Sequence, residues 1–464
     1  MRFAMSNPAH GNRASMVRSF ESMNRIPAPQ GLRAVQESLL EDRAFSWYEY
    51  VPVSYDGSQP VPLVIQLHGG GNDGMRWSNY TIWHLMAEKQ GFLVVYPNSP
   101  VPGMWTCGDE DIAYLEALIG HLCGKYCVDN TRIYMQGMSN GEMMTLAFTM
   151  RHPEMLAAAG NLTGPSPAEM IDDERPVGAL PLYQMRGEKD VFFQLPDPLP
   201  RDIYAKRYGM NDFNREIWLE ANGVQGLPSL TIRGKDNYLV YQGTHAPIIN
   251  HEIQSMGHRE PTDSAQTMWN LLYANARRVD GKPVVELPPA LLAGDADGVA
   301  VAIGSNRVYK ADHIETMHPS PFGHARFLAP PANEPHFNAV NIGEMFETPE
   351  VYVPVEGLGV LFGAKTELVD PGMSARAVFP DGTEYVFHAD ALLVTRNGEY
   401  LALRKPSLLV SGMFLVPLGE IATELLGKRT SMVANVMYVS DHHAQLGRYT
   451  ATILLRLLEG IPEL

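Results

Sequence analysis

The sequence predicts an α/β fold with a mainly parallel sheet, followed by a smaller β-rich domain. From about residue 45 to residue 190, strand-like and helix-like segments take turns along the chain, which is typical of a parallel sheet with crossover helices. Two of the strands are continuous apolar runs, "PLVIQL" at 62–67 and "FLVVYP" at 92–97, as expected for strands buried on both faces. Beyond residue 299, short strand-like runs and turns replace the alternation.

The elements of the first part follow one another in a regular order. Residues 1–40 are polar and contain "RIPAPQG", so we expect a lead-in with one short helix. The α/β domain is expected to cover residues 41–285 and to open with the strand-like "FSWYEYVPV". Its further predicted elements are helices at 77–91, 111–126 and 141–153 and strands at 132–137, 157–162 and 180–187.

The second part begins after a passage rich in proline and glycine, "ELPPALLAGDADG" at 286–298, which we interpret as a linker. Residues 299–464 would form an accessory domain. Within it "VYVPVEGLGVLFGAKT" and "FLVPLGEIATELLGKRT" both show Val-Pro, an apolar helical run and a closing glycine. We therefore predict a strand-then-helix unit used twice, at about 350–366 and 413–430.

Composition and charge narrow the class of protein. The 464 residues are 45% hydrophobic and 19% charged, as in a folded protein of two domains. The 36 basic and 52 acidic residues give a net charge of −16, which disfavours nucleic acid and anionic membranes as partners. No apolar stretch approaches the roughly 20 residues of a membrane span. The first residues lack a secretory signal, so we expect a cytoplasmic protein, or a secreted or cell-surface one whose signal was removed; the oligomeric state is not indicated.

No metal or other cofactor is expected. Cys123 and Cys127 stand four apart on a predicted helix without a second ligand pair nearby, so ordinary thiols are favoured over metal ligands, and three cysteines form no disulfide framework. The "DADG" at 295–298 lacks the third acid and closing Glu of a calcium loop. Adjacent Asp441, His442 and His443 chelate poorly, which favours a polar loop.

The strongest motif is "IYMQGMSNGEMM" at 133–144. Gly137 and Gly141 flank Ser139 between a predicted strand and a predicted helix. This Gly-x-Ser-x-Gly turn is the nucleophile elbow, in which a strained serine is exposed and small neighbours let strand and helix pass closely. We therefore predict that Ser139 is a nucleophile; the alternative is an ordinary strand–helix turn.

A serine nucleophile needs a base and an acid that orients the base, in the chain order Ser, acid, His. Asp190 follows the predicted strand 180–187 directly and is our candidate acid, with Glu188 and Asp197 as nearby competitors. His258, in "MGHREP", follows another strand-like run and is the candidate base. The alternatives for the base, which are less well placed, are His251 at the start of that run and His245 in the turn before it.

An oxyanion hole completes the predicted site. The glycine run "LHGGGNDG" follows the strand 62–67, so Gly70 and Gly71 are candidate first donors and the Asn140 N–H is the second. The run lacks the Gly-Lys-Ser/Thr ending of a P-loop, and it matches the dinucleotide fingerprint imperfectly.

Three more residues could line an apolar acyl or aryl pocket or pack in the core: Trp77, Trp105 and Met138.

Residues 45–275 resemble the polyhydroxybutyrate depolymerase-like esterases, α/β-hydrolases that include feruloyl and acetylxylan esterases. The resemblance is carried by "YVPVSYDGSQPVPLVIQLHGGG", "GFLVVYPNS", "VDNTRIYMQGMSNGEMM", "GEKD" and "MGHREP", and by "MWTCGDEDIAYL" before the elbow. It implies Ser139, Asp190 and His258 as the triad. Glu142 departs from the small residue usual there, and about 60 residues separate Asp190 from the His258 strand, where 191–250 could form a lid.

More weakly, "VYVPVEGLGVLFGAK" and "FLVPLGEIATELLGK" resemble the repeated domain named after the copper amine oxidase N-terminus. This domain is often found on bacterial surface proteins, and the resemblance implies no copper site.

Together these observations predict a serine esterase that acts through an acyl-enzyme on short-chain, aryl (feruloyl-like) or polyester substrates, with polymeric or plant cell-wall esters as candidate partners. The alternatives are a serine peptidase of prolyl-oligopeptidase type and a non-catalytic surface or polysaccharide attachment protein. Since all predicted site residues precede residue 260, a chain ending near Val285 is expected to fold and to cleave a small ester.

Overall fold

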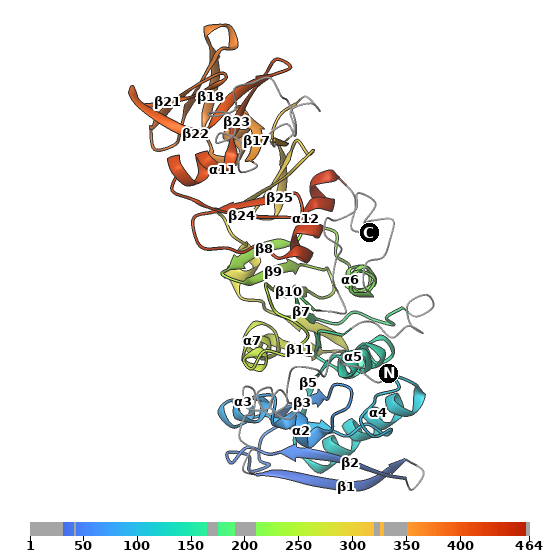
Figure 1. Cartoon of the computed structure of the whole chain (residues 1–464). Coiled ribbons are helices and arrows are strands. Elements are labelled where there is room, and N and C mark those ends of the chain that lie inside the picture. The colour runs from blue at the N-terminus through green and yellow to red at the C-terminus, as the bar shows by residue number, and fades with distance from the viewer. Residues whose placement is uncertain are drawn as a thin grey trace, which may run out of the picture.

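A computed structural model describes residues 31–40, 43–164, 175–190, 210–319, 325–328 and 350–460. The molecule is elongated and has three parts arranged one after another (Figure 1). A ten-stranded sheet with helices lies at one end, an eight-stranded sheet at the other, and a five-stranded sheet lies between them.

The ten-stranded sheet has the order β1-β2-β4-β3-β5-β6-β7-β10-β9-β8. Its six central strands, from β4 to β10, pair in parallel, and the strands at both edges pair antiparallel. The strands are β1 (Leu32–Leu40), β2 (Arg43–Tyr50), β3 (Val61–Leu67), β4 (Leu93–Pro97), β5 (Val128–Met138), β6 (Ala158–Leu162), β7 (Leu182–Gly187), β8 (Ser229–Arg233), β9 (Asp236–Tyr241) and β10 (Ile248–Ile253).

Helices cover both faces of this sheet, which explains why its central strands are apolar throughout. One core, on the face of α4 and α5, includes Leu115 and Phe148; the other, on the face of α3 and α7, includes Trp83 and Trp269. The helices are α2 (Gly74–Ser78), α3 (Trp83–Gln90), α4 (Asp109–Lys125), α5 (Asn140–Arg151), α6 (Met210–Ala221), α7 (Ser264–Leu271) and α8 (Pro289–Ala293). The predicted fold class is confirmed: this is an α/β-hydrolase sheet.

One sequence-based expectation needs correction here, and the lid considered within 191–250 stays a prediction. Residues 32–40 of the expected lead-in form β1, an edge strand paired with β2; residues 1–30, with the predicted short helix, lie outside the described residues. Within 191–250, where a lid was considered, 191–209 lie outside the described residues. The rest forms α6 and the hairpin of β8 and β9, which extends the sheet from β10.

The C-terminal part is antiparallel and β-rich, as predicted. Its five-stranded sheet has the order β15-β14-β13-β25-β24, and its eight-stranded sheet the order β16-β17-β23-β22-β21-β20-β19-β18. A hairpin of β11 (Ala276–Val279) and β12 (Lys282–Val285) precedes them. The strands are β13 (Val299–Ala302), β14 (Arg307–Lys310), β15 (His313–Thr316), β16 (Arg326–Leu328), β17 (Glu350–Pro354), β18 (Lys365–Val369), β19 (Ser374–Val378), β20 (Glu384–His388), β21 (Ala391–Arg396), β22 (Glu399–Val410), β23 (Met413–Pro417), β24 (Arg429–Val433) and β25 (Val436–Ser440), and the helices are α10 (Gly357–Phe362), α11 (Leu418–Glu420) and α12 (Arg448–Glu459).

The two similar sequence segments form similar structures. Each consists of a strand ending in proline and a helical segment. The first is β17 with α10, and the second is β23 with α11 and the short π-helix at Ile421–Leu425. The strands β17 and β23 pair antiparallel, with Val353 opposite Val416. The internal repeat is therefore also a pair of neighbours in space.

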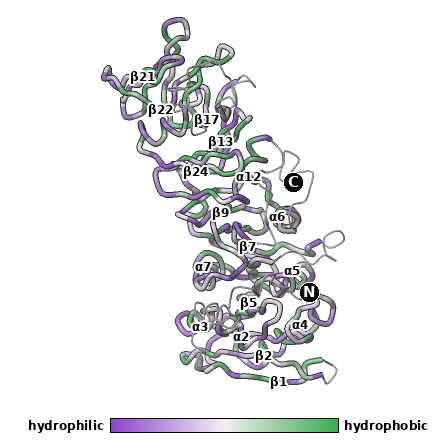
Figure 2. Tube along the Cα trace, viewed as in Figure 1, coloured by the Kyte–Doolittle hydropathy of each residue, from purple (hydrophilic) through white to green (hydrophobic). Residues whose placement is uncertain are grey.

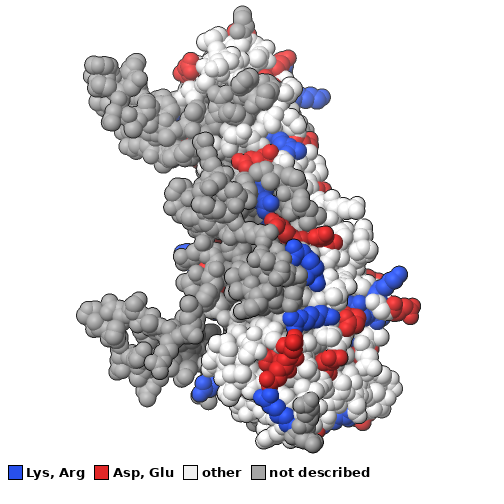
Figure 3. All heavy atoms as spheres, turned by 90° about the vertical axis from the view of Figure 1, so that its right-hand side faces the viewer, with Lys and Arg blue, Asp and Glu red and all other residues white. Residues whose placement is uncertain are grey.

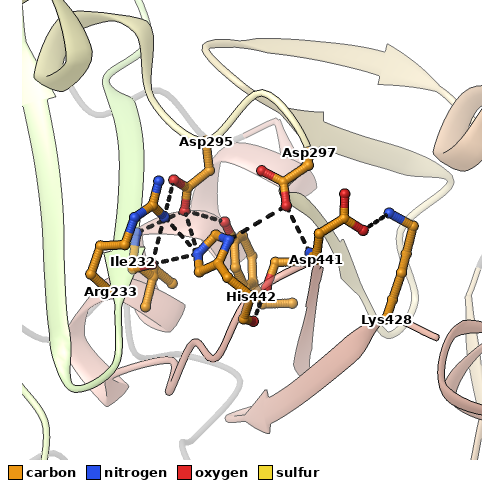
Figure 4. Close-up of polar contacts among 9 residues, drawn as sticks. Ile232, Arg233, Asp295, Asp297, Lys428, Asp441 and His442 are labelled. Carbon is orange, nitrogen blue, oxygen red and sulfur yellow. Dashed lines mark hydrogen bonds and ion pairs between the residues drawn. The ribbon is translucent and has the colours of Figure 1, made fainter.

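The junction between the α/β-hydrolase part and the C-terminal part is packed, and the segment 286–298, which the sequence suggests is a linker, takes part in this packing. It contains α8 and Asp295, whose side chain is fully buried. The Asp295 carboxylate accepts the Ile232 N–H (2.9 Å) and the Tyr438 hydroxyl (2.8 Å) and pairs with Arg233. Figure 4 shows His442 between Asp295 and Asp297, 3.5 Å and 3.4 Å from their carboxylate oxygens.

A common hydrophobic core crosses this junction. On the α/β-hydrolase side it includes Trp218 and Tyr241, and on the C-terminal side Tyr309, Tyr438 and Leu454. In Figure 2, apolar stretches run along the whole length of the molecule. The five-stranded sheet and α12 therefore share a core with the α/β-hydrolase part, whereas the eight-stranded sheet packs in a separate core with the other face of the five-stranded sheet.

Two surface properties bear on partners. Among the described residues, no helix is long and apolar enough to cross a membrane. Figure 3 shows basic and acidic side chains interspersed over the described part of one face. That part of the surface offers no extended cationic area for a polyanion.

Candidate active site

The predicted elbow connects β5 to α5. Ser139 has φ 57° and ψ −118°, a strained conformation for a residue with a side chain. A Cβ at Gly137 would collide with the backbone of Gly141, and one at Gly141 would lie 2.6 Å from the Leu67 and His68 carbonyl oxygens. Both glycines are therefore needed for the close approach of α5 to β3 and β5.

The structure brings the three candidate triad residues together. Ser139 Oγ lies 2.9 Å from His258 Nε2, and His258 Nδ1 lies 2.9 Å from Asp190 Oδ2. The Asp190 side chain is fully buried, and the His258 side chain is 22% exposed. The carboxylate can therefore orient the imidazole, whose side chain keeps some exposure to solvent.

Close backbone packing aligns the acid with the base. The parallel strands β7 and β10 are neighbours, and a Cβ at Gly187 would collide with the backbone of Met256 and Gly257, in the loop before His258. The Lys189 N–H donates to the Met256 carbonyl over 2.8 Å. The turn after β7 and the loop after β10 are thus fastened to each other.

The competing candidates have other roles or lie elsewhere. The Glu188 carboxylate accepts the Ser255 N–H (2.9 Å), so it supports the loop that leads to His258. His251 contacts Tyr183 and Asp236 and stacks on Tyr238. His245 lies in a turn, where its backbone N–H donates to the Asn222 carbonyl. Asp197 lies outside the described residues.

We expect Asp190→Asn to lower kcat roughly 10⁴-fold, because an amide favours the wrong tautomer of His258. The matched control is Glu188→Gln, whose amide oxygen can still accept the Ser255 N–H. Steady-state hydrolysis of a nitrophenyl ester by both variants makes the comparison. A mild Asp190→Asn together with a severe Glu188→Gln would show that the acid has been misassigned.

The glycine loop requires one correction. The Gly71 N–H donates to the Gly103 carbonyl over 2.7 Å, so it holds two loops together and is not directed at a substrate. Gly70 lies against the elbow, since a Cβ there would be 3.7 Å from Asn140 Cβ. The candidate donors are therefore Gly70 and the Asn140 N–H in the first turn of α5, where helical N–H groups lack intrahelical acceptors.

His68, which the sequence analysis did not single out, helps to hold the glycine loop in place through both of its ring nitrogens. Its Nδ1 lies 2.9 Å from the Gly69 carbonyl, and its Nε2 accepts the Ser99 N–H (3.2 Å). Burial lowers the pKa of His68, and the neutral ring has one donor and one acceptor for these two partners.

The Asn140 side chain has a second role that the motif did not reveal. It accepts the Trp105 N–H (2.8 Å) and donates to the Trp105 carbonyl (2.9 Å). Trp105 is buried, donates its indole N–H to the His68 carbonyl and stacks on Tyr114. It is therefore a core residue that supports the glycine loop. The sequence does not show the two contacts of the Asn140 amide with Trp105, because they join segments that are far apart along the chain.

Trp77 and Met138 are also buried, and both lie against Gly69. They pack in the core on the other side of the sheet from Trp105. A cavity of about 470 Å³ opens beside the same loop, with Gly71, Arg76 and Ser99 in its wall. The wall of this cavity is mainly polar and includes none of Ser139, Asp190 and His258.

Glu142 is buried directly behind the elbow. Its carboxyl group accepts the Gly164 N–H, and Gly164 packs so closely that a Cβ would collide with the Ser139 carbonyl. Burial raises the pKa of Glu142 well above its usual value, with the charge of Asp190 adding to this and that of Arg186 opposing it. Glu142, which stands where the resembled family usually has a small residue, therefore lies within range of the Asp190 charge.

Part of the chain is similar in sequence to known esterases. Residues 45–170 match the family described as Esterase PHB depolymerase. The chain is 30% identical over 132 residues to a bifunctional acetylxylan esterase/xylanase of Neocallimastix patriciarum and 28% identical over 127 residues to feruloyl esterase B of Neurospora crassa. These alignments cover 28% and 25% of this chain but only 19% and 43% of the two relatives.

Among solved structures, an acetyl xylan esterase from Aspergillus awamori aligns with a TM-score of 0.39 and 16% identity, over 51% of this chain and 97% of the other. The family match ends at residue 170, so it includes Ser139 and the glycine loop, whereas Asp190 and His258 lie beyond it and are brought to Ser139 by the fold. The first part of the chain thus has an α/β-hydrolase fold, and its residues 45–170 are similar to the family described as Esterase PHB depolymerase.

Proposed function

We propose that the protein hydrolyses carboxylic esters through an acyl-enzyme on Ser139. The observation that carries this proposal is the continuous contact from Ser139 to His258 to Asp190, at 2.9 Å for each step. An inert attachment domain has no need to keep a strained serine within hydrogen-bonding distance of an oriented imidazole.

In the acylation step, Ser139 Oγ attacks the ester carbonyl carbon while His258 Nε2 takes the hydroxyl proton. The carbonyl oxygen becomes an oxyanion between the N–H groups of Gly70 and Asn140. When the tetrahedral intermediate collapses, the bond to the alcohol oxygen breaks and His258 donates its proton to that oxygen. The alcohol leaves, and the acyl group remains on Ser139.

Deacylation repeats these steps with water. His258 accepts a proton from the water molecule, whose oxygen attacks the acyl carbon. When this second intermediate collapses, the bond from the acyl carbon to Ser139 Oγ breaks and His258 returns the proton to Ser139 Oγ. The products are a carboxylic acid, an alcohol and the free enzyme. Asp190 keeps its negative charge throughout and stabilises the imidazolium.

For the substrate class, we propose acetyl, short-chain or feruloyl-type aryl esters, including those carried by a polymer. The support is the similarity of residues 45–170 to relatives named as acetylxylan and feruloyl esterases. The C-terminal sheets would then hold bulky substrates near the site.

A substrate panel with a covalent probe tests the proposal. We expect turnover of nitrophenyl acetate, a feruloyl ester or acetylated xylan, little cleavage of the matching anilides and proline peptides, and labelling of Ser139 by a fluorophosphonate. Ser139→Ala is the control for labelling. Cleavage of the amides at rates similar to the esters would favour a peptidase, and a purified protein that neither labels nor turns over any ester would refute the esterase.

A further inference from the structure

The segment 162–164, which includes the end of β6, lies directly against the nucleophile elbow. The Leu162 carbonyl accepts the Ser139 N–H over 2.9 Å. A Cβ at Gly164 would collide with the Ser139 carbonyl oxygen, so this glycine packs against the backbone of the nucleophile. The strained conformation of Ser139 is therefore supported on both sides of its peptide unit by one short segment.

The same segment is itself strained and reaches the next strand. Thr163 is fully buried and has φ 53°, an unfavourable backbone conformation for a β-branched residue. Its N–H donates to the Met185 carbonyl of β7 over 3.0 Å, and β7 leads to the triad acid Asp190. Because backbone strain persists only where the surroundings hold it, we expect a further contact that fixes residues 162–164.

Glu142 makes such a contact from α5. It stands three residues after the nucleophile and is 3% exposed. Its carboxyl group accepts the Gly164 N–H, and a Cβ at Gly164 would lie 2.7 Å from Glu142 Cβ. Burial of a carboxyl group is costly unless the group is hydrogen-bonded. The side chain thus joins the first turn of α5 to the segment behind the elbow.

We propose that Glu142 is a positioning residue for the nucleophile. Its carboxyl group fastens residues 162–164 to α5, and these residues in turn hold the backbone of Ser139. The proposal rests on the esterase function proposed above and adds to it a residue that acts through the backbone of the elbow.

The position of the elbow decides two features of the site. Ser139 Oγ lies 2.9 Å from His258 Nε2, and the Asn140 N–H, a candidate oxyanion-hole donor, belongs to the next residue. A misplacement of about 1 Å in such an arrangement can lower the rate about 100-fold. Because the contact acts on the reacting groups, its loss should lower kcat more than it changes KM.

The test compares Glu142→Gln with Glu142→Met in the full chain. The two side chains are similar in size, but only Gln keeps a carbonyl oxygen for the Gly164 N–H. In Glu142→Met we expect kcat for a nitrophenyl ester, and the rate of fluorophosphonate labelling of Ser139, to fall about 10- to 100-fold, while KM changes less than about threefold. Glu142→Gln should stay within about threefold of the wild type in both rates. A folded Glu142→Met that keeps its rate, or a Glu142→Gln as slow as Glu142→Met, would overturn the proposal.

Thr149→Val is the matched control on the same helix. Thr149 is fully buried, and its hydroxyl donates to the Leu146 carbonyl over 3.1 Å. It lies about 10 Å further along the helix axis than Glu142. Its substitution should lower thermal stability at most and leave kcat unchanged. A loss of rate as large as that of Glu142→Met would show that any damage to α5 slows the enzyme, which contradicts a specific role for Glu142.

Glu142→Asp provides a second measurement in case Glu142→Met does not fold. Its carboxyl group is one methylene shorter, so it keeps the acid but is drawn back from the Gly164 N–H. Its rates should be at least several-fold lower than those of Glu142→Gln. A folded Glu142→Asp as fast as the wild type would also overturn the proposal. A wild-type chain that neither labels nor hydrolyses any ester would instead refute the esterase function, so the two failures are distinguishable.

Discussion

Ser139→Ala should abolish ester hydrolysis, with kcat reduced by at least 10⁴-fold and by as much as about 10⁶-fold. The change removes the attacking oxygen, and neither Gly70 nor the first turn of α5 supplies another. The fold should persist, because the Ser139 backbone and not its side chain carries the packing of the elbow: its N–H donates to the Leu162 carbonyl over 2.9 Å. Purified protein, circular dichroism and a nitrophenyl ester assay are sufficient.

Ser255→Ala is a suitable control for this variant. Ser255 also has a positive φ, 64°, and lies in the loop before His258. Its backbone N–H, which the substitution preserves, makes the contact with Glu188. Activity close to that of the wild type is expected. A tenth of the activity remaining in Ser139→Ala would show that the nucleophile lies elsewhere.

The part of the site that could be predicted depends on local pattern. The elbow is specified by five consecutive residues, since only glycine allows the backbone approaches at Gly137 and Gly141. Asp190 and His258 followed from the rule that the partners of an elbow serine come after later strands of the sheet. The apolar runs of β3 and β4 predicted parallel strands for the same reason, because each is a contiguous segment buried on two faces.

What could not be predicted depends on contacts between distant segments. The sequence suggests Gly71 as an oxyanion-hole donor, but the Gly71 N–H donates to the Gly103 carbonyl. The sequence does not show that the hairpin of β8 and β9, which lies between Asp190 and β10, extends the sheet by pairing with β10. The register that places Glu252 beside Arg186 is visible only once β7 and β10 are neighbours. Nothing in the sequence near residue 449 indicates that the start of α12 is bound by the side chains of Asn237 and Glu252.

The remaining large effect concerns the C-terminal part. The sequence favoured a foldable chain ending near Val285, but the packing predicts that such a chain is insoluble, or soluble and inactive toward a small ester. It would expose core residues such as Trp218 and Tyr241 and remove the three donors of Glu252. Each large apolar side chain that loses its burial costs about 1.5–3 kcal/mol, so the loss for a handful of them is comparable to a typical net stability of about 5–15 kcal/mol.

Two shorter deletions separate α12 from the rest of the C-terminal part. A chain ending at Gly460 keeps all of α12 and should be as active as the full chain. A chain ending at Gly447 loses α12 and the few residues that follow it. Since Ile453, Leu454 and Leu458 of this helix are at most 1% exposed, this chain should lose solubility or activity like the chain ending at Val285. Soluble yield and nitrophenyl acetate turnover, compared across the three chains, decide the matter. A soluble chain ending at Val285 with a kcat near that of the full protein would show that the hydrolase domain is complete without α12, despite the core they share.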